Sequence, residues 1–545
     1  MTSRNALRAL LLASSILLFV DLGGSSIWDA NEAYYVETPR QMVLTGDYVS
    51  PSFNGEPRFN KPVLSYWVVA GFYKVFGVSV TSERIAIAFG ALMIIGATFM
   101  IGRTLGGNDA GTLAALIVAS APRVMLWSRR IFIDIYLTSF LSVALMAFVL
   151  ARAHPEHRRR WLLLMYAALG LATLTKGPVA LVLPGLILAI ELVAARRLGD
   201  LKQWMLPMGL LIVVAIVAPW YVLDYQRHGW QHIHDFFVGE NVNRFAETYG
   251  QQHRPPLFYL GVLLTDLLPW SLFLPAAIWS AWRARDERLR LLLVWIAVFV
   301  GVFTLSSTKQ DLYIFPIVPA VAALIACVLT AADGSGESAG VQRWLRGGAI
   351  VTAVELVLVG AFAVWVSTIS KTLPNLPQVA IVGGVLVAGG FASALVAFRA
   401  RLTTLVITLA VTAVMANWLL VTVVMRPYER FKPVAPISAW LLEHAPLNAV
   451  VAHYKTQLPS MTYYLGRPIT QVFDPEALAR LIDQQPALYV LLRAHEYDDL
   501  RGATTARLCV IDRRTLPIFD AAKLSEIVSG NLPQIWLVGV KDACR

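Results

Sequence analysis

Residues 28–67 form a polar segment between two strongly apolar ones, and the segment carries charged side chains of the types used in group transfer. Its charged residues include three acids within nine positions, a following arginine and a single lysine before a proline: Asp29, Glu32, Glu37, Arg40 and Lys61. Glu37 and Arg40 are spaced to form a simple surface ion pair. Transfer from a phosphate to a hydroxyl requires a base for the acceptor and cations that stabilise the leaving phosphate. The segment supplies both, which predicts an active-site loop at a membrane surface that acts on a lipid-linked anionic substrate.

Several acids could serve as the base. Glu32 and Asp29 lie in the polar segment itself, and Asp134 ends a second polar stretch with the sequence WSRRIFID. Asp29 and Asn31 have an alternative role as helix caps, because their side chains accept hydrogen bonds from the free N–H groups at a helix start. Glu32 and Asp134 are therefore the leading candidates for the base.

The composition predicts what must position these groups. Of the 545 residues, 57% are hydrophobic and only 15% are charged, with a mean hydropathy of +0.60. This is more apolar surface than one soluble core can bury, and the apolar runs approach the roughly 20 residues that a bilayer requires. The net charge of +11 comes from Arg and Lys gathered in short turns between apolar runs, as the positive-inside rule predicts. We therefore expect a polytopic, mainly α-helical protein in a lipid bilayer, and no nucleic-acid partner.

The hydropathy pattern predicts about thirteen spans. The first, residues 6–24, lacks an A-x-A-like cleavage site and is expected to remain as an uncleaved helix. The others are expected at 84–103, 108–124, 133–153, 161–175, 177–195, 203–223, 257–282, 287–306, 310–331, 343–367, 377–398 and 402–425. Residues 63–80 are expected to lie in the interface as an amphipathic helix, because a further span there would place the basic turn 152–160 outside. The N-terminus is then cytoplasmic and the C-terminus periplasmic.

Four polar stretches fall on the outer face in this topology and are expected to converge on one cavity: 25–83, 127–134, 224–256 and 307–311. We therefore expect a transmembrane domain over residues 1–426, with its main periplasmic loops at 25–83 and 224–256. Residues 427–545 alternate short β-rich runs with helical stretches such as 475–484, which predicts a small periplasmic α/β domain. The expected strands are 449–454, 469–473, 487–494, 506–512 and 534–540.

Cysteines and histidines offer two further features. Cys327 falls in an apolar run, whereas Cys509 and Cys544 could form a disulfide in an extracytoplasmic domain. Four histidines gather in the 224–256 loop beside Asp235: His228, His232, His234 and His253. A metal site there is conceivable, but the segment has no cysteine and no HExxH pattern. We therefore expect no cofactor; a divalent metal is not favoured.

Five motifs occur in a fixed order along residues 1–430: NEAYYVETPRQM, FNKPVLSYW, RRIFID, LTKGP and ENVNRF. In that order they resemble the bacterial aminoarabinose lipid A transferase group within the C-type, polyprenyl-phosphate-dependent glycosyltransferases. The resemblance implies a C-type membrane fold with its active site at the outer face and a sugar donor carried on undecaprenyl phosphate. It also implies an acid in the first outer loop.

The resemblance assigns roles to individual residues. It implies that Lys61 contacts the lipid phosphate, with an anchoring lysine as the alternative, and that Arg244 makes a second phosphate contact. Tyr35 and Tyr66 could supply hydroxyls, although aromatic residues at this depth also form interfacial belts. The family typically has an acid where this chain has Asn31, so the acid role passes to Glu32, Asp29 or Asp134. Three other cations are expected on the outer face: Arg129, Arg130 and Lys176. They could act in the site or contact lipid headgroups.

Some family members hold a divalent cation with a Glu before the lysine and a His before the arginine. This chain has Asn60 and Asn241 there, which argues against that site. The function expected is transfer of an aminoarabinose-like or other sugar from undecaprenyl phosphate to lipid A or another envelope glycolipid, at the periplasmic face of the bacterial inner membrane. The alternatives are protein O-glycosylation from the same donor, an inactive lipid-binding relative, and a transporter or flippase. A transporter is disfavoured because the polar residues lie in loops and no paired broken helices are evident.

Overall fold

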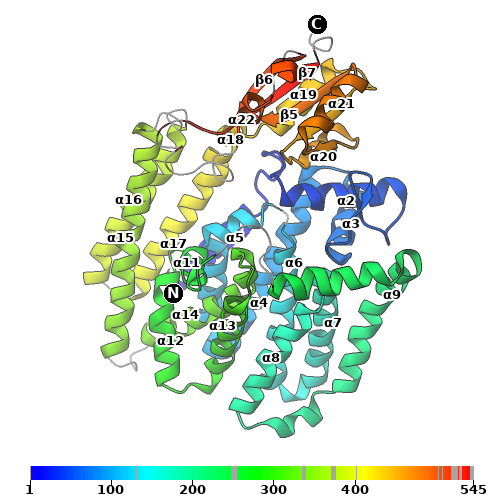
Figure 1. The fold of residues 1–545 in the computed structure, drawn as a ribbon. Coiled ribbons are helices and arrows are strands. Elements are labelled where there is room, and N and C mark those ends of the chain that lie inside the picture. The colour runs from blue at the N-terminus through cyan, green and yellow to red at the C-terminus, as the bar shows by residue number, and fades with distance from the viewer. Residues whose placement is uncertain are drawn as a thin grey trace.

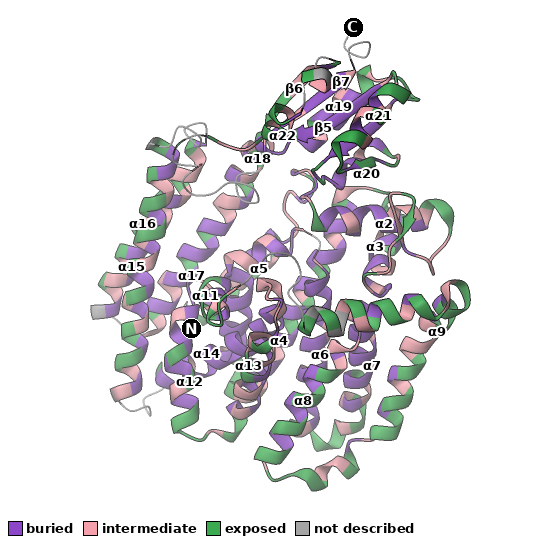
Figure 2. Ribbon diagram, in the orientation of Figure 1, coloured by how far each residue is buried: buried purple, intermediate pink, exposed green. Residues whose placement is uncertain are grey.

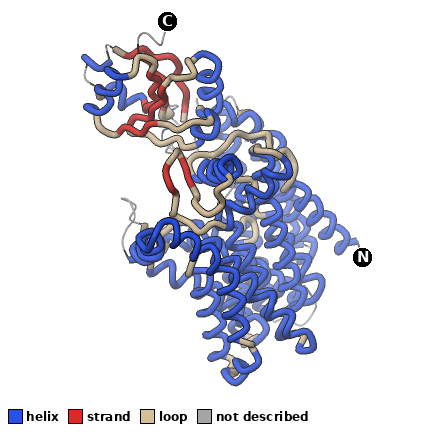
Figure 3. The backbone as a smooth tube through the Cα atoms, turned by 90° about the vertical axis from the view of Figure 1, so that its right-hand side faces the viewer, coloured by secondary structure: helices blue, strands red, loops and turns tan. Residues whose placement is uncertain are grey.

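A bundle of long helices makes up most of the protein, with a small α/β unit at one end (Figures 1 and 3). The computed structural model describes residues 2–130, 132–246, 254–333, 339–369, 376–399, 402–500, 502–505, 507–516, 526, 529 and 531–540. In this part of the chain, eight helices are long and apolar enough to cross a membrane, or nine if one bent pair is a single span. The protein is therefore a mainly α-helical, multi-pass membrane protein, as predicted, while the count of about thirteen spans stays a prediction.

The principal helices of the bundle follow the chain in order. They are α1 (Thr2–Leu17), α4 (Val80–Ser120), α6 (Ile133–Ala153), α7 (Arg158–Lys176), α8 (Val179–Ala194), α9 (Leu206–His234), α12 (Leu274–Arg283), α13 (Glu287–Leu305), α14 (Val318–Asp333), α15 (Ala339–Ile369), α16 (Pro377–Arg399) and α17 (Leu402–Leu419). Helix α14 is buried along most of its length, whereas α9, α15 and α16 expose many apolar side chains (Figure 2). Apolar side chains on the outside of such helices are what a lipid environment requires.

Helix α4 is two helical segments that fold back on each other. Gly107 breaks it with φ 89° and ψ 179°, in the region that favours glycine. Across this break Gly111 packs so closely that a Cβ would lie 2.7 Å from the carbonyl oxygen of Phe99. The two arms therefore correspond to the separate spans predicted at 84–103 and 108–124.

Other predicted segments differ from the observed ones. Helix α3 (Leu64–Phe76) has 13 residues, about 20 Å, so it is too short to cross a core of about 30 Å, in line with the prediction. The span predicted at 257–282 is not one continuous helix. The chain there forms α11 (Phe258–Asp266) and a second segment, Ser271–Arg283, bent by 117°. Pro269 lies in the break, where its missing N–H cannot continue a helix.

The polar stretch predicted as a long loop at 224–256 is helical from 224 to 246, and the described residues 254–256 are not helical. Helix α9 continues to His234 and changes direction at Gly229, whose φ is 74°. A π-helix, Asp235–Asn243, and the short α10 (Arg244–Ala246) follow. This helical arm crosses below the first loop (Figure 1), so it brings its polar residues to the same end of the bundle.

The C-terminal unit has the α/β character that was predicted. Five strands form one mixed sheet in the order β4-β3-β5-β7-β6, with β3 parallel to β4 and β5, and β7 antiparallel to β5 and β6. The strands are β3 (Val450–Tyr454), β4 (Thr470–Val472), β5 (Leu488–Arg493), β6 (Leu508–Thr515) and β7 (Gln534–Val540), with the helices α19 (Val434–His444), α20 (Ser460–Leu465) and α21 (Pro475–Gln484). Cys509 in β6 is disulfide-bonded and Cys327 is free; Cys544 lies outside the described residues.

The first polar segment lies between this unit and the bundle (Figures 1 and 3). It forms α2 (Asn31–Thr45), which ends at a left-handed Gly46, and a small hairpin of β1 (Ser52–Phe53) and β2 (Glu56–Pro57). The hairpin is joined to the C-terminal unit, since Asn54 donates to the carbonyl of Ile469 and accepts from its N–H. The segment is thus held from both sides.

Candidate functional site

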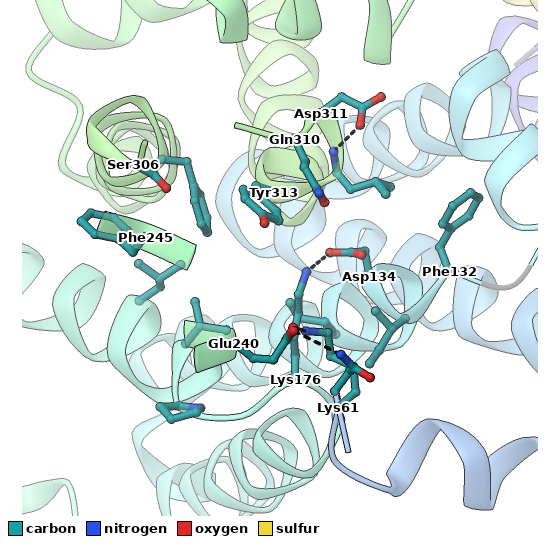
Figure 4. A pocket seen from close by; sticks show the side chains of 18 of the residues that line it. Lys61, Phe132, Asp134, Lys176, Glu240, Phe245, Ser306, Gln310, Asp311 and Tyr313 are labelled. Atoms are coloured by element: carbon teal, nitrogen blue, oxygen red, sulfur yellow. Dashed lines mark hydrogen bonds and ion pairs between the residues drawn. The ribbon is translucent and has the colours of Figure 1, made fainter. Parts of the chain in front are cut away.

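A cavity of about 900 Å³ opens where the first polar segment meets the bundle (Figure 4). Its polar lining comes from five separate parts of the chain: Asn31, Tyr34, Tyr35, Arg58, Asn60 and Lys61; Asp134; Lys176; Glu240 and Arg254; Ser306, Gln310, Asp311 and Tyr313. Many of its other lining residues are apolar, among them Leu137, Leu141, Val179, Val182, Leu183, Phe299 and Phe303. A cavity lined by both charged and apolar side chains suits a ligand that has a charged head and a hydrocarbon tail.

Two lysine–acid pairs line the cavity (Figure 4). The Nζ of Lys61 is 2.9 Å from Oε2 of Glu240, whose other oxygen accepts from Asn60 at 3.2 Å. The Nζ of Lys176 is ion-paired with Oδ1 of Asp134. All four charged side chains are less than one fifth exposed, so the ion pairs are screened by water less than surface pairs are.

The helices favour the charges of the second pair. Asp134 lies in the first turn of α6 and Lys176 in the last turn of α7. An acid near a helix N-terminus and a cation near a C-terminus each interact favourably with the helix dipole. Gly177 ends α7 with φ 85°, and this turn leaves Lys176 at the rim of the cavity.

Four of the predicted site residues line the cavity: Asn31, Tyr35, Lys61 and Asp134. Tyr66 does not, because it is fully buried behind Tyr35, with the two rings stacked 5.5 Å apart. The side chain of Arg244 lies outside the described residues, although its neighbours Phe245 and Ala246 contribute to the lining.

Glu32 is not at the cavity. Its side chain is 1% exposed and accepts from Arg84 at 2.9 and 3.0 Å and from the N–H of Trp28 at 2.6 Å. Arg84 also donates to the carbonyls of Leu22 and Ser25. The expectation that Glu32 is the base therefore conflicts with the structure, because the geometry makes this carboxylate the anchor of the first segment on α4.

Asp29 points to the C-terminal unit instead of the cavity. Its two oxygens accept from the backbone N–H of Ser460 at 2.7 Å and from the Ser460 hydroxyl at 2.5 Å. Burial raises the pKa of Asp29 to about 6, against the lowering effect of the Ser460 hydrogen bonds. Neither Asp29 nor Asn31 caps α2, since the cap position is Ala30 and no side chain caps it.

The other expected charged groups have structural partners. Glu37 is fully buried, and its carboxylate is bonded to Arg40 at 3.0 Å and to Gln41. The expected ion pair between Glu37 and Arg40 therefore forms, but its acid is buried and not at the surface. Arg129 donates to the carbonyls of Leu17 and Asp21, and Arg130 stacks on the ring of Trp28 at 3.8 Å. Lys176 is the one of the three predicted outer-face cations that lines the cavity.

The histidines take separate partners. His228 is 2.8 Å from the Ser50 hydroxyl, His232 is 2.6 Å from Asp224, and His234 lies beside Asp235. Within the described part of the chain, no three His, Cys, Asp or Glu residues are placed to hold a metal ion together. His253 and the side chain of Asn241 lie outside the described residues.

Sequence reasoning missed several lining residues: Arg58, Glu240, Arg254, Gln310, Asp311 and Tyr313. Arg58 stacks on Tyr34 at 3.7 Å, and Asp311 is ion-paired with Arg123, which also holds Asp266 at 2.6 Å. Glu240 meets Lys61 across 179 positions of sequence. The sequence signal for Glu240 was that it is the first residue of the ENVNRF motif. No local spacing rule connects Glu240 to Lys61.

Comparisons with known proteins found similar sequences and similar folds. A family model described as dolichyl-phosphate-mannose-protein mannosyltransferase matches residues 60–222. An undecaprenyl phosphate-alpha-4-amino-4-deoxy-L-arabinose arabinosyl transferase of Pseudomonas fluorescens is 32% identical over 332 residues, 60% of this chain and 56% of the relative. A relative of the same name from Pseudomonas aeruginosa is 32% identical over 58% of each chain. The chain thus spans a little over half the length of the curated relatives it matches.

Solved structures extend the likeness to the whole fold. ArnT from Cupriavidus metallidurans bound to undecaprenyl phosphate superposes with a TM-score of 0.78 over 97% of both chains, at 20% identity. An Archaeoglobus fulgidus oligosaccharyltransferase matches with a TM-score of 0.50 over 91% of this chain and 70% of the other. These matches confirm the membrane fold that the five motifs implied, and the sequence matches confirm the resemblance to the aminoarabinose transferase group.

Proposed function

We propose that this chain, which has the fold of ArnT and resembles the aminoarabinose transferases in sequence, is a glycosyltransferase. It moves a sugar from undecaprenyl phosphate to lipid A or another envelope glycolipid at the periplasmic face of the bacterial inner membrane. One observation carries the proposal: a single cavity combines two largely shielded lysine–acid pairs with many apolar lining side chains. Binding a lipid phosphate requires both the charged and the apolar side chains, whereas binding a soluble sugar phosphate requires only the charged ones.

Lys61 is the proposed phosphate contact. An ammonium binds a phosphate oxygen as a point charge, and Lys61 lies in the cavity with Glu240 as its counter-ion. An incoming phosphate competes with Glu240 for this ammonium. Arg58 and Arg254 line the same cavity and add cationic groups that stabilise charge on the leaving phosphate.

Asp134 is the proposed base, since it lines the cavity while Glu32 and Asp29 do not. In the proposed step the acceptor hydroxyl gives its proton to Asp134 while its oxygen attacks the anomeric carbon of the sugar. The bond between that carbon and the phosphate oxygen breaks, and undecaprenyl phosphate leaves with the electron pair. Lys176 holds the Asp134 carboxylate in place, and Asn31 can donate a hydrogen bond to the sugar, since its amide lines the same cavity.

The proposed topology keeps the N-terminus in the cytoplasm and the C-terminal unit, residues 427–545, in the periplasm. The cavity then faces the periplasm, on the same side as the C-terminal unit that holds the first segment through Asp29 and Asn54. The basic turn 152–160 lies at the opposite end of α6 from Asp134 and is cytoplasmic in this arrangement.

Binding of undecaprenyl phosphate to the purified protein in nanodiscs tests the proposal. A charge-assisted hydrogen bond is worth about 1.5–3 kcal/mol, so Lys61→Ala should weaken binding about tenfold or more. Lys74→Ala is the matched control, because Lys74 lies on the neighbouring α3 and stacks on Tyr48 away from the cavity lining. Undecaprenol, which lacks the phosphate, should bind both variants and wild type alike. Equal affinity of wild type and Lys61→Ala for undecaprenyl phosphate would refute the phosphate site.

A second candidate acceptor is a protein hydroxyl. The family model that matches residues 60–222 is described by transfer to protein, which favours this alternative for the acceptor but not for the donor class. Glycoprotein and lipid A analysis of a deletion strain separates the two, because only one class of molecule loses its sugar.

A further inference from the structure

A second groove lies at the end of the bundle opposite the cavity. It has a volume of about 530 Å³ and runs between α1 and both arms of α4, lined by Arg8, Leu11, Leu12, Phe99, Arg103 and Asn108 among others. A neighbouring hollow shares Arg8 and Asn108 and reaches Arg288 at the start of α13. Ser306, just beyond the other end of α13, lines the cavity, and the 19 residues of α13 span about 28 Å. The groove is therefore separate from the candidate active site.

Along the helix axes, the cations of the groove lie about one turn from its apolar side chains. On α1, Leu12 lies one turn beyond Arg8; on α4, Phe99 lies one turn before Arg103. Leu12 is 62% exposed, so this apolar surface is open to the surroundings of the bundle. Two arginines at the head of an open apolar groove match the two parts of a phospholipid.

Charge pairing distinguishes these two arginines from their neighbours. Arg4 is bonded to Asp109 at 2.7 Å, and Arg288 to Asp286 at 2.9 Å. Arg8 and Arg103 form no ion pair or hydrogen bond with any residue that the structure describes. Two guanidinium groups without an acid partner favour an anionic ligand, and the planar fork of each can bond two phosphate oxygens.

We propose that this groove binds an anionic diacyl phospholipid of the leaflet opposite the cavity. The headgroup phosphate lies between Arg8 and Arg103, and an acyl chain follows Leu11, Leu12 and Phe99. Basic pockets between transmembrane helices bind anionic headgroups in this way, and each cation near the surface contributes about a factor of five in affinity. The inference rests on this groove alone and is independent of glycosyl transfer.

Lipid retention by the purified full chain tests the proposal. Native mass spectrometry after titration with phosphatidylglycerol measures affinity in wild type and in the Arg8→Ala/Arg103→Ala variant, which should bind about 25-fold more weakly. Arg159→Ala/Arg160→Ala is the matched control, because it removes the same charge from two exposed arginines at the start of α7, outside the groove. It should stay within twofold of wild type. Inorganic phosphate should not compete, since it lacks the acyl chains.

A conservative variant protects the test against misfolding. Arg8→Lys/Arg103→Lys keeps both charges and should retain most of the phosphatidylglycerol binding, whereas Ser15→Trp fills the apolar part of the groove and should reduce it. Equal loss in the groove variant and the Arg159/Arg160 control, or unchanged binding in both, overturns the proposal. Displacement of the lipid by inorganic phosphate would also overturn it, because the site would then be a simple anion site.

Discussion

Glu32→Gln provides a sharp test of the roles that the structure gives to the acids. The Glu32 carboxylate and the Arg84 guanidinium are each 1% exposed and share two hydrogen bonds. Removing one partner of a buried ion pair typically costs about 3–5 kcal/mol, because the other charge stays buried without compensation. Glu32→Gln should therefore lower thermal stability by several degrees, measured by fluorescence-detected size-exclusion chromatography after heating. Transfer per folded molecule, assayed well below the melting temperature, should fall far less than it would for loss of a base.

Two further variants complete this experiment. Glu287→Gln is the control, since Glu287 is 69% exposed and 3.9 Å from Arg290, a geometry worth at most about 1 kcal/mol. The double variant Arg84→Met/Glu32→Met should lower the free energy of unfolding by less than the sum of the two single changes, because no uncompensated charge remains. A Glu32→Gln protein that melts like wild type yet transfers no sugar would show that the carboxylate is catalytic after all.

Three other predictions concern the proposed base, the buried Asp29 and the membrane orientation. Asp134→Asn should slow transfer by about 10²–10⁴-fold without loss of undecaprenyl phosphate binding. If this variant transfers sugar as fast as wild type, Asp134 is not the base. Asp29 has a folded-state pKa of about 6, above its ordinary 3.8, so the folded protein holds its proton more tightly than the unfolded chain. Relative to Asp29→Asn, wild type should therefore lose stability as pH rises from about 4 to about 6 and change little above that; parallel melting curves across this range would contradict it. Reporter fusions after Arg160 and after Val540 should give cytoplasmic and periplasmic signals, and the reverse pattern would refute the orientation.

The sequence predicted the architecture well wherever local patterns determine it. The five strands of the C-terminal unit were expected within a few residues of their observed bounds, because alternating apolar runs between turns are a local signal. The short helix α3 was recognised because positive-inside counting excluded a further span. The bend in the predicted 257–282 span was not foreseen, since a 26-residue apolar run hides a break until Pro269 is weighed against it.

The motifs named some of the residues that the structure brings together, and the roles of these residues stay predictions. Lys61 and Asp134 were named from motifs and both line the cavity. Glu32 was favoured as a base because the predicted topology puts its loop on the same outer face as Asp134. Its partner Arg84 is 52 positions away, and no local rule joins the two. Glu240 was missed for the same reason, since long-range ion pairs depend on tertiary packing.

The central claim is that this cavity transfers a sugar from undecaprenyl phosphate to an envelope acceptor. Mass spectrometry of lipid A and other envelope glycans from a deletion strain, complemented with wild type, Lys61→Ala or Asp134→Asn, tests it most directly. One sugar-sized modification should disappear on deletion, return with wild type and stay absent or strongly reduced with either variant. Envelope glycans that are unchanged by the deletion, or fully restored by both variants, would contradict it.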